Sequence, residues 1–140
     1  MNKNNSIRKQ IDLYVKEKYG ITPEILPFAH EKYEIYRHTE SGRWFSVFIE
    51  KQRSEFGLEG KGEVEVICVK PRDSEYAIFL MSEKGYLRGF PSKGWNWLSI
   101  ILDGTVSIED IYSFIDESYF STKGKTKNKK TPLAKKIDFD

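Results

Sequence analysis

The side chains best suited to metal binding or nucleophilic catalysis are few in this chain and far apart. Its only histidines are His30 and His38, and its single cysteine, Cys68, lies in an alternating apolar stretch. A catalytic nucleophile needs a neighbouring base and a group that orients it, and no spacing in the sequence supplies that set. Asp103-Gly104 falls between an expected strand and an expected helix, where these residue types form turns. We therefore expect no enzyme activity, no metal site and no cofactor.

A second set of residues has the chemistry to hold a polyanion such as DNA. Arginine and lysine side chains fall in or beside the expected hairpin loops, where cations from two hairpins could contact one phosphate backbone. Taken singly, each such side chain is most often ordinary solvated surface. Tryptophans accompany these cations, and an indole on an open sheet face can stack on a base. The candidate DNA-binding residues are Arg37, Arg43, Trp44, Lys51, Arg53, Arg88, Lys93 and Trp95.

The tryptophans also have a purely structural interpretation, because aromatic side chains on a sheet usually belong to the core. Trp95 and Trp97 alternate with Asn96 and Leu98, so both indoles point to the same side of the expected strand. We expect Trp97 to be a core residue. Trp95 lies beside a turn and Trp44 at a hairpin edge, and for these two the sequence leaves packing and binding open.

Charge is distributed unevenly along the chain. Residues 121–140 contain seven lysines and two aspartates, a net charge of +5, whereas residues 1–120 carry 16 basic and 19 acidic residues, or −3. A basic segment attracts polyanions without needing a fold. DNA is therefore a candidate partner, although a merely solubilising tail explains the same composition. We expect an α+β domain over residues 1–121 and a lysine-rich disordered tail over residues 122–140.

Length and composition indicate one globular domain. The chain has 140 residues, of which 39% are hydrophobic and 14% aromatic, enough to build a single core. No apolar run approaches the roughly 20 residues of a membrane span, and the amino end lacks the apolar stretch of a signal peptide. One cysteine cannot form an intramolecular disulfide. We expect a cytoplasmic protein that does not bind membranes, with the oligomeric state open and a monomer favoured.

Apolar spacing and turn residues indicate three helices and about five strands. Helices are expected over residues 6–19, 73–84 and 107–119, and strands over residues 32–38, 43–51, 63–70, 86–90 and 95–102. The prolines at 23 and 27 indicate an extended connector before the first strand. Consecutive strands joined by short loops predict an antiparallel sheet, with the helices of an α+β fold at both ends of the chain.

Several local details accompany these elements. Gly42 is expected to supply the positive φ of a hairpin loop over residues 39–42. Ser107 is expected to cap the last helix, with Asp110 at its third position. The inward stripes are expected to hold Ile7, Ile11, Tyr14, Val15 and Tyr19 in the first helix, Tyr76, Phe79 and Leu80 in the second, and Ile108, Ile111, Ile115 and Tyr119 in the third.

Over residues 6–121 the chain resembles the MmcQ/YjbR family of small bacterial proteins. The motifs that carry this resemblance are Arg37-His38, Gly42-x-Trp44-Phe45, Arg53 with Gly57-Leu58, Gly62-Glu63-Val64, Lys70, Gly85-Tyr86, Trp97, Asp103-Gly104-Thr105-Val106 and Asp116-Glu117-Ser118-Tyr119. The resemblance implies a frataxin-like (CyaY-like) fold and DNA binding by two projecting hairpins, or wings. Here the wings would be residues 39–43 and 86–95. Pro91-Ser92-Lys93-Gly94 departs from the His-Met-Asn-Lys-like stretch that members often carry.

The sequence thus leads to one hypothesis and one alternative from a different class. The hypothesis is a non-enzymatic protein with weak nucleic-acid binding through basic hairpin loops and the lysine-rich tail. The alternative is a small-ligand or protein-binding module that uses an open aromatic sheet face. That alternative predicts that Trp44, Trp95 or Tyr36 is exposed beside an apolar patch.

Overall fold

The computed structural model describes residues 3–28, 31–89 and 97–124. Within these residues the chain forms three α-helices, one short 3-10 helix and six strands. In chain order the elements are α1 (Lys3–Tyr19), β1 (Glu24–Phe28), β2 (Glu31–Arg37), β3 (Trp44–Gln52), η1 (Arg53–Phe56), β4 (Glu63–Val69), α2 (Ser74–Leu80), β5 (Tyr86–Arg88), β6 (Leu98–Ile101) and α3 (Ile108–Ser121). Lys93, Trp95 and residues 125–140 of the expected tail lie outside the described residues.

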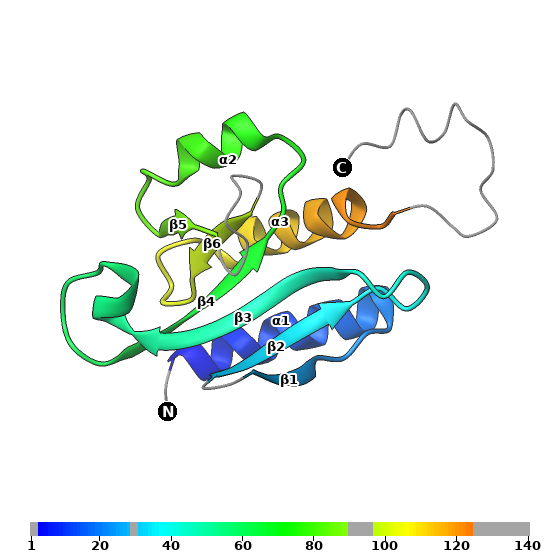
Figure 1. The fold of residues 1–140 in the computed structure, drawn as a ribbon, viewed down its shortest axis with the longest axis horizontal. Coiled ribbons are helices and arrows are strands. Elements are labelled where there is room, and N and C mark those ends of the chain that lie inside the picture. The colour runs from blue at the N-terminus through cyan, green and yellow to red at the C-terminus, as the bar shows by residue number, and fades with distance from the viewer. Residues whose placement is uncertain (1–2, 29–30, 90–96, 125–140) are drawn as a thin grey trace.

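The six strands form one sheet in the order β1-β2-β3-β4-β6-β5, and every neighbouring pair is antiparallel (Figure 1). This confirms the predicted α+β class with helices at both ends of the chain. The structure adds β1, where the sequence indicated only an extended connector. Its register runs from Glu24 opposite Ile35 to Phe28 opposite Glu31. The proline at position 27 is compatible with a strand here because β1 is the edge of the sheet, where one side needs no ladder hydrogen bonds.

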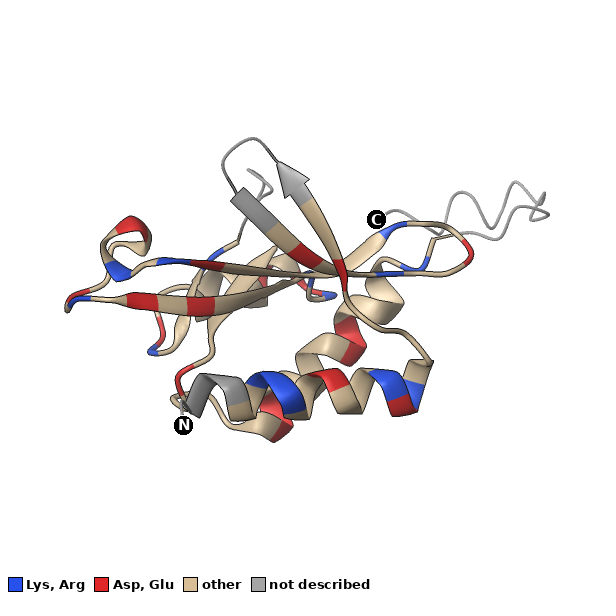
Figure 2. Cartoon of the chain, turned by 90° about the horizontal axis from the view of Figure 1, so that it is seen from below, with Lys and Arg blue, Asp and Glu red and all other residues tan. Residues whose placement is uncertain are grey.

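Helices α1 and α3 lie along the same side of the sheet (Figure 2). The main core fills the space between them and the strands, with Ile11 and Val15 of α1 and Ile111 and Ile115 of α3 essentially inaccessible to solvent. These stripes have the predicted spacing. The predicted cap of α3 is also confirmed, because the backbone N–H of Asp110 donates to Ser107 Oγ at 3.1 Å.

The opposite face of the sheet carries a second buried cluster that includes Ile35, Val47, Val66 and Cys68. Partly buried side chains pack against it, namely Leu26, Tyr33, Trp44, Phe56, Leu58, Leu87 and Trp97. Tyr36, expected by the alternative to be exposed, is instead fully buried on the helix side of the sheet. Among the described residues, the centre of the sheet is therefore buried on both faces.

The second helix differs from its prediction in length and in orientation. α2 ends at Leu80, and its inward residues are Ala77 and Leu80. Tyr76 and Phe79, expected to face inward, are 46% and 58% exposed. A helix of two turns that is apolar on several sides can pack through any of its faces, so its pattern of aromatic residues did not identify the buried one.

Strand register brings both hairpins to one end of the sheet. Arg37 lies opposite Trp44 at the β2–β3 loop, and Leu98 lies opposite both Val69 and Arg88. We call this region, comprising residues 37–44, Lys70, Arg88, Trp97 and residues 122–124, the hairpin end. The other end holds η1 (Figure 1). At about 3.3 Å per residue, β3 separates the two ends by about 25 Å.

Candidate nucleic-acid interface

A cleft of about 310 Å³ opens at the hairpin end. Its lining consists of Arg43, Trp44, Lys70, Trp97 and Thr122. Trp44 begins β3, Lys70 follows β4 and Trp97 precedes β6, so the ends of three adjacent strands each position one side chain. The charged side chains among its described lining residues are Arg43 and Lys70, and both are cations. We call it the Trp44–Trp97 cleft.

A β-bulge places Trp44 in the cleft. Arg37 pairs with Trp44 and Tyr36 with Ser46, so Phe45 is an extra residue in β3. Such an insertion bends the strand and re-aims its side chains. Phe45 accordingly packs in the main core on the helix side, whereas Trp44 packs with the cluster on the opposite face.

His38 and Thr122 form a buried hydrogen bond behind the cleft. The Thr122 hydroxyl donates to the carbonyl oxygen of Ser118 at 2.7 Å, and this uses its only proton. At 2.9 Å, the Nε2–H of His38 must therefore donate to Thr122 Oγ1. Burial, together with the positive charges of Lys123 and Arg43, lowers the pKa of His38 to about 4. The imidazole is thus neutral at pH 7 and serves as a fixed hydrogen-bond donor.

Ser118 holds α3 against the strand ends that form the cleft. Its hydroxyl donates to the carbonyl oxygen of Phe45 at 2.5 Å and accepts from the backbone N–H of Lys70 at 2.8 Å. The side chain is fully buried. A single hydroxyl therefore links the bulge in β3, the end of β4 and the last turns of α3, which positions Trp44 and Lys70 relative to each other.

Cations gather around this braced region. Arg43 is exposed, and a Cβ placed on Gly124 would lie 3.2 Å from its Nε and Cζ atoms, so the chain passes close to the guanidinium. Lys123 is also exposed, and both cations act on the pKa of His38. The last described residue, Gly124, thus lies beside Arg43, which lines the cleft.

The structure separates the predicted DNA-binding residues into groups. Arg37, Arg43, Trp44 and Arg88 lie at the hairpin end, and Arg88 is exposed. The Arg37 guanidinium is paired, however, because it contacts both carboxylate oxygens of Glu24 at 2.9 and 3.2 Å. This contact holds the pKa of Glu24 below its usual range.

Two other predicted residues lie at the far end of β3. Lys51 is 4.0 Å from the carboxylate of Glu55, and Arg53 Nε donates to the carbonyl oxygen of Glu59 at 2.5 Å. They share no surface with the cleft. Lys93 and Trp95 are outside the described residues.

Sequence reasoning did not select Lys70, Thr122 or His38 for this site, and it assigned Trp97 to the core. Trp97 is half-buried, packing against the second cluster while also lining the cleft. Lys70 directly follows a buried strand, and its place between two tryptophans depends on the pairing of β4 with both β3 and β6. No local pattern in the sequence indicates that pairing.

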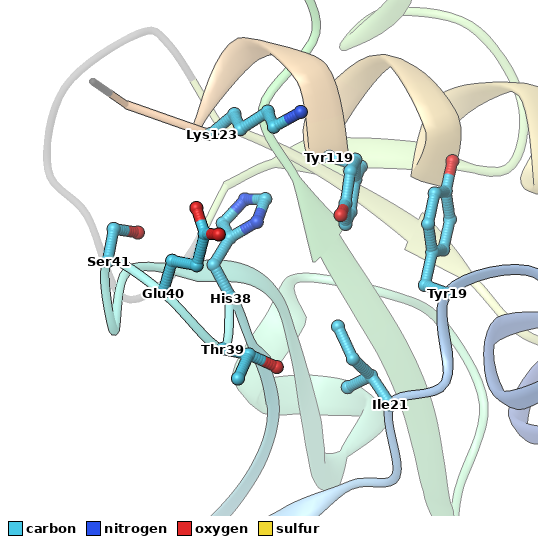
Figure 3. A pocket seen from close by; sticks show the side chains of 8 residues that line it. All are labelled: Tyr19, Ile21, His38, Thr39, Glu40, Ser41, Tyr119 and Lys123. Carbon is cyan, nitrogen blue, oxygen red and sulfur yellow. The ribbon is translucent and has the colours of Figure 1, made fainter. Parts of the chain in front are cut away.

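A second cavity, of about 320 Å³, lies beside the β2–β3 loop (Figure 3). Its lining is formed by Tyr19, Ile21, His38, Thr39, Glu40, Ser41, Tyr119 and Lys123. The rings of Tyr19 and Tyr119 are stacked with centroids 3.8 Å apart. Glu40 and Lys123 give this cavity both signs of charge, which distinguishes it from the cationic Trp44–Trp97 cleft.

The described part of the chain lacks two features, a metal-binding cluster and a membrane-spanning helix. Across residues 3–28, 31–89 and 97–124, no three side chains of His, Cys, Asp or Glu come together in a way that could hold a metal ion. In the same residues, none of the helices combines the length and apolar character needed to span a bilayer.

Comparison with known proteins identifies a relative over most of the chain. No family model matches the sequence. Over 119 residues the chain is 32% identical to the uncharacterized protein YyaQ of Bacillus subtilis strain 168, an alignment that covers 83% of this chain and 98% of YyaQ. The chain belongs to the YyaQ family.

Solved structures with the same fold come from two other bacteria. A Pseudomonas syringae protein solved by the Northeast Structural Genomics Consortium matches with a TM-score of 0.74 for its crystal structure, at 24% identity, covering 82% of this chain and 97% of that one. A Deinococcus radiodurans protein with a DUF419 domain matches with a TM-score of 0.62 at 18% identity, covering 91% of this chain and 87% of that one. These similarities establish the fold.

Proposed function

We propose that this YyaQ-family protein is of the MmcQ/YjbR type and binds nucleic acid, without catalysing a reaction, through the hairpin end of its sheet. The main support for this proposal is that Arg43, Lys70 and Lys123 lie at the same end of the fold as the indoles of Trp44 and Trp97. Phosphates are the usual partners of such cations, and bases are the usual partners of such aromatic side chains.

The composition of the carboxy-terminal segment supports a polymeric anion rather than a small one. Gly124 passes beside Arg43, and the sequence continues with six lysines within residues 125–136. A nucleic acid seated at the cleft could contact this basic segment along the same backbone. The acidic charge of residues 1–120 opposes binding, so we expect modest affinity that falls steeply with salt.

The arrangement of strands narrows the interface predicted from sequence. The β2–β3 loop and the paired residues Arg88 and Leu98 lie at the same end of the sheet, which supports the two-wing arrangement that the family resemblance implies. We assign the phosphate contacts to Arg43, Lys70, Arg88 and Lys123. Arg37 is not included because its charge is neutralised by Glu24. Lys51 and Arg53 are not included because about 25 Å of strand separates them from the cleft.

Fluorescence anisotropy with labelled DNA, between about 50 and 200 mM salt, tests this assignment. We expect the double variant Arg43→Gln/Lys70→Gln to bind more weakly than the parent. Loss of two phosphate contacts should lower the log–log salt slope by about 1.8 on duplex DNA. The matched control is Lys51→Gln/Lys61→Gln, which removes the same charge from the opposite end and should bind like the parent.

The outcomes separate the cleft from the basic segment. If neither single-stranded nor duplex DNA binds even at the lower salt concentration, the proposal is wrong. If binding persists in the Arg43/Lys70 variant but disappears when residues 125–140 are deleted, the cleft is not the interface and the tail alone attracts DNA.

A further inference from the structure

We propose that the Trp44–Trp97 cleft receives one unpaired base, so that the protein prefers single-stranded nucleic acid to duplex. This inference rests on the proposed function and adds the form of nucleic acid that the site accepts. It depends on the positions of the two indoles, the size of the cleft and the charges around it.

The two indoles lie at the ends of the strands on either side of β4. Trp44 belongs to β3, and Trp97 directly precedes β6, with Lys70 at the end of the strand between them. Two strand spacings place the backbones of β3 and β6 about 10 Å apart. Both indoles pack with the cluster on the same sheet face, so they border one cleft. A planar ring that enters the cleft meets aromatic surface supplied by two strands.

The size of the cleft favours a single base over a base pair. Its volume of about 310 Å³ is at the lower limit of the roughly 300–1,000 Å³ range of small-molecule sites. In a duplex each base is stacked and paired, and it must be extruded before it can enter such a site. An unpaired base in a single strand avoids that penalty, and the cleft therefore discriminates between the two forms.

The charges and hydrogen bonds of the lining fit the backbone that carries such a base. Arg43 and Lys70 are placed to contact flanking phosphates, and no carboxylate among the described residues lines the cleft. The Thr122 hydroxyl proton is already donated to Ser118, so it cannot be donated to a base edge. We therefore expect recognition mainly through the face of the base, with little sequence preference.

Comparison of three labelled probes with the full chain tests this inference without altering the protein. The probes are a short oligothymidine, an abasic strand of the same length, and the duplex form of the oligothymidine. The first two carry the same phosphate charge and differ only in their bases. We expect oligothymidine to bind about tenfold more tightly than the abasic strand, equivalent to about 1.4 kcal/mol. It should also bind more tightly than the duplex and quench tryptophan fluorescence.

The variant Trp97→Leu provides the second arm. Leucine keeps apolar packing against the second cluster but removes the stacking surface. We expect this variant to lose about tenfold in affinity for oligothymidine and to bind the abasic strand like the parent. Loss of affinity for both strands would attribute the effect to altered folding and contradict the proposed stacking role.

Equal binding of oligothymidine and the abasic strand, or equal binding of single strand and duplex, would overturn this inference while leaving nucleic-acid binding at the hairpin end intact. Failure of all three probes to bind would overturn the proposed function together with it.

Discussion

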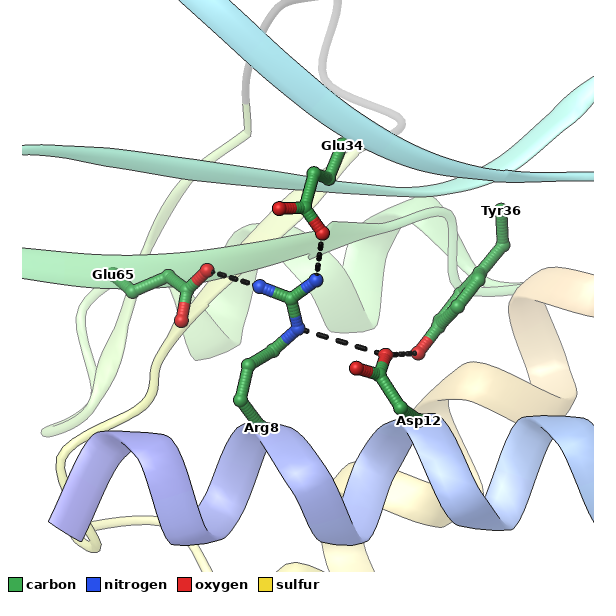
Figure 4. A network of polar contacts seen from close by, with 5 residues as sticks. All are labelled: Arg8, Asp12, Glu34, Tyr36 and Glu65. Atoms are coloured by element: carbon green, nitrogen blue, oxygen red, sulfur yellow. Dashed lines mark hydrogen bonds and ion pairs between the residues drawn. The ribbon is translucent and has the colours of Figure 1, made fainter. Parts of the chain in front are cut away.

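Replacement of Arg8 by methionine should destabilise the protein by about 3 kcal/mol at neutral pH, which is within the range for breaking a buried ion pair. The Arg8 side chain is 14% exposed, and its guanidinium lies between α1 and the sheet among three carboxylates (Figure 4). It contacts Glu65 at 2.5 Å, bonds Glu34, and lies 3.6 Å from Asp12. It also lies 3.6 Å over the ring centroid of Phe48.

The size of the effect follows from what remains when the guanidinium is removed. Methionine keeps most of the apolar contact with the Phe48 ring but leaves the three carboxylates without their shared cation. Asp12 retains the hydroxyl of Tyr36 at 2.5 Å. Glu65, which is 15% exposed, keeps no side-chain hydrogen bond or ion pair to another described residue. A buried charge without a partner is the main source of the expected loss.

The loss should depend on pH. Burial raises the pKa of Glu65 to about 7, although the attraction of Arg8 opposes this rise. Between an unfolded-state pKa of about 4.3 and about 7, the folded protein binds more protons at Glu65 than the unfolded chain does, so this group's contribution to stability falls as pH rises through that window. Without Arg8 the pKa of Glu65 rises further. The variant's deficit should therefore be larger at pH 7.5 than at pH 5.

Urea unfolding followed by circular dichroism at both pH values measures this deficit. With a slope of about 2 kcal/mol per molar urea, a loss of 3 kcal/mol moves the midpoint by about 1.5 M. Lys9→Met is the matched control, because it removes the same charge from an exposed position of the same helix. A deficit below about 1 kcal/mol, or one that is the same at both pH values, would refute the role assigned to Arg8.

Three further predictions concern two buried polar contacts behind the hairpin end and the turn at Gly85. Because the pKa of His38 is lowered to about 4, the unfolded chain binds more protons at this residue than the folded protein does between about pH 6.5 and 4. The free energy of unfolding should therefore fall as pH falls through that window, and it should fall less steeply in His38→Gln. Identical pH profiles of the two proteins in chemical denaturation would contradict this. Ser118→Ala leaves the carbonyl of Phe45 and the amide of Lys70 without their buried partner and should lower the free energy of unfolding by about 1–3 kcal/mol, whereas the exposed control Ser113→Ala should change it by less than about 0.5 kcal/mol. Gly85→Ala should lower the melting temperature, because φ is +94° and the new Cβ would lie 2.7 Å from a methyl of Val106; an unchanged melting temperature would show that the turn adjusts freely.

Local signals made much of the fold predictable. The stripes of α1 and α3 repeat at helical spacing over several turns, and the Ser107 cap is a short-range contact. α2 was less predictable because it has only two turns and carries apolar residues on several sides. β1 was missed because the proline in its sequence indicates a connector unless the strand's place at the sheet edge is known.

The missed strand also explains why the sequence favoured Arg37 as a binding residue. Glu24 lies in β1, and the register of that strand places Glu24 opposite Ile35, two residues from Arg37. Without β1, Arg37 looks like an unpaired cation at a hairpin, and with β1 it is an ion pair. In the same way, Lys70 became a candidate only when the pairing of β4 with β3 and β6 placed it between two tryptophans.

The stabilising Arg8 network and the proposed binding site lie on opposite faces of one sheet. The Arg8 network joins α1 to the helix side, whereas Trp44 and Trp97 belong to the cluster on the other side. Ser118 and His38 connect the two faces of the sheet, because they hold the end of α3 against the strands that form the cleft. Substitutions at Arg8 should therefore change folding without changing DNA affinity in the folded protein. Substitutions at Ser118 should change both, since the same hydroxyl that stabilises the fold also positions Lys70 and the bulge that orients Trp44.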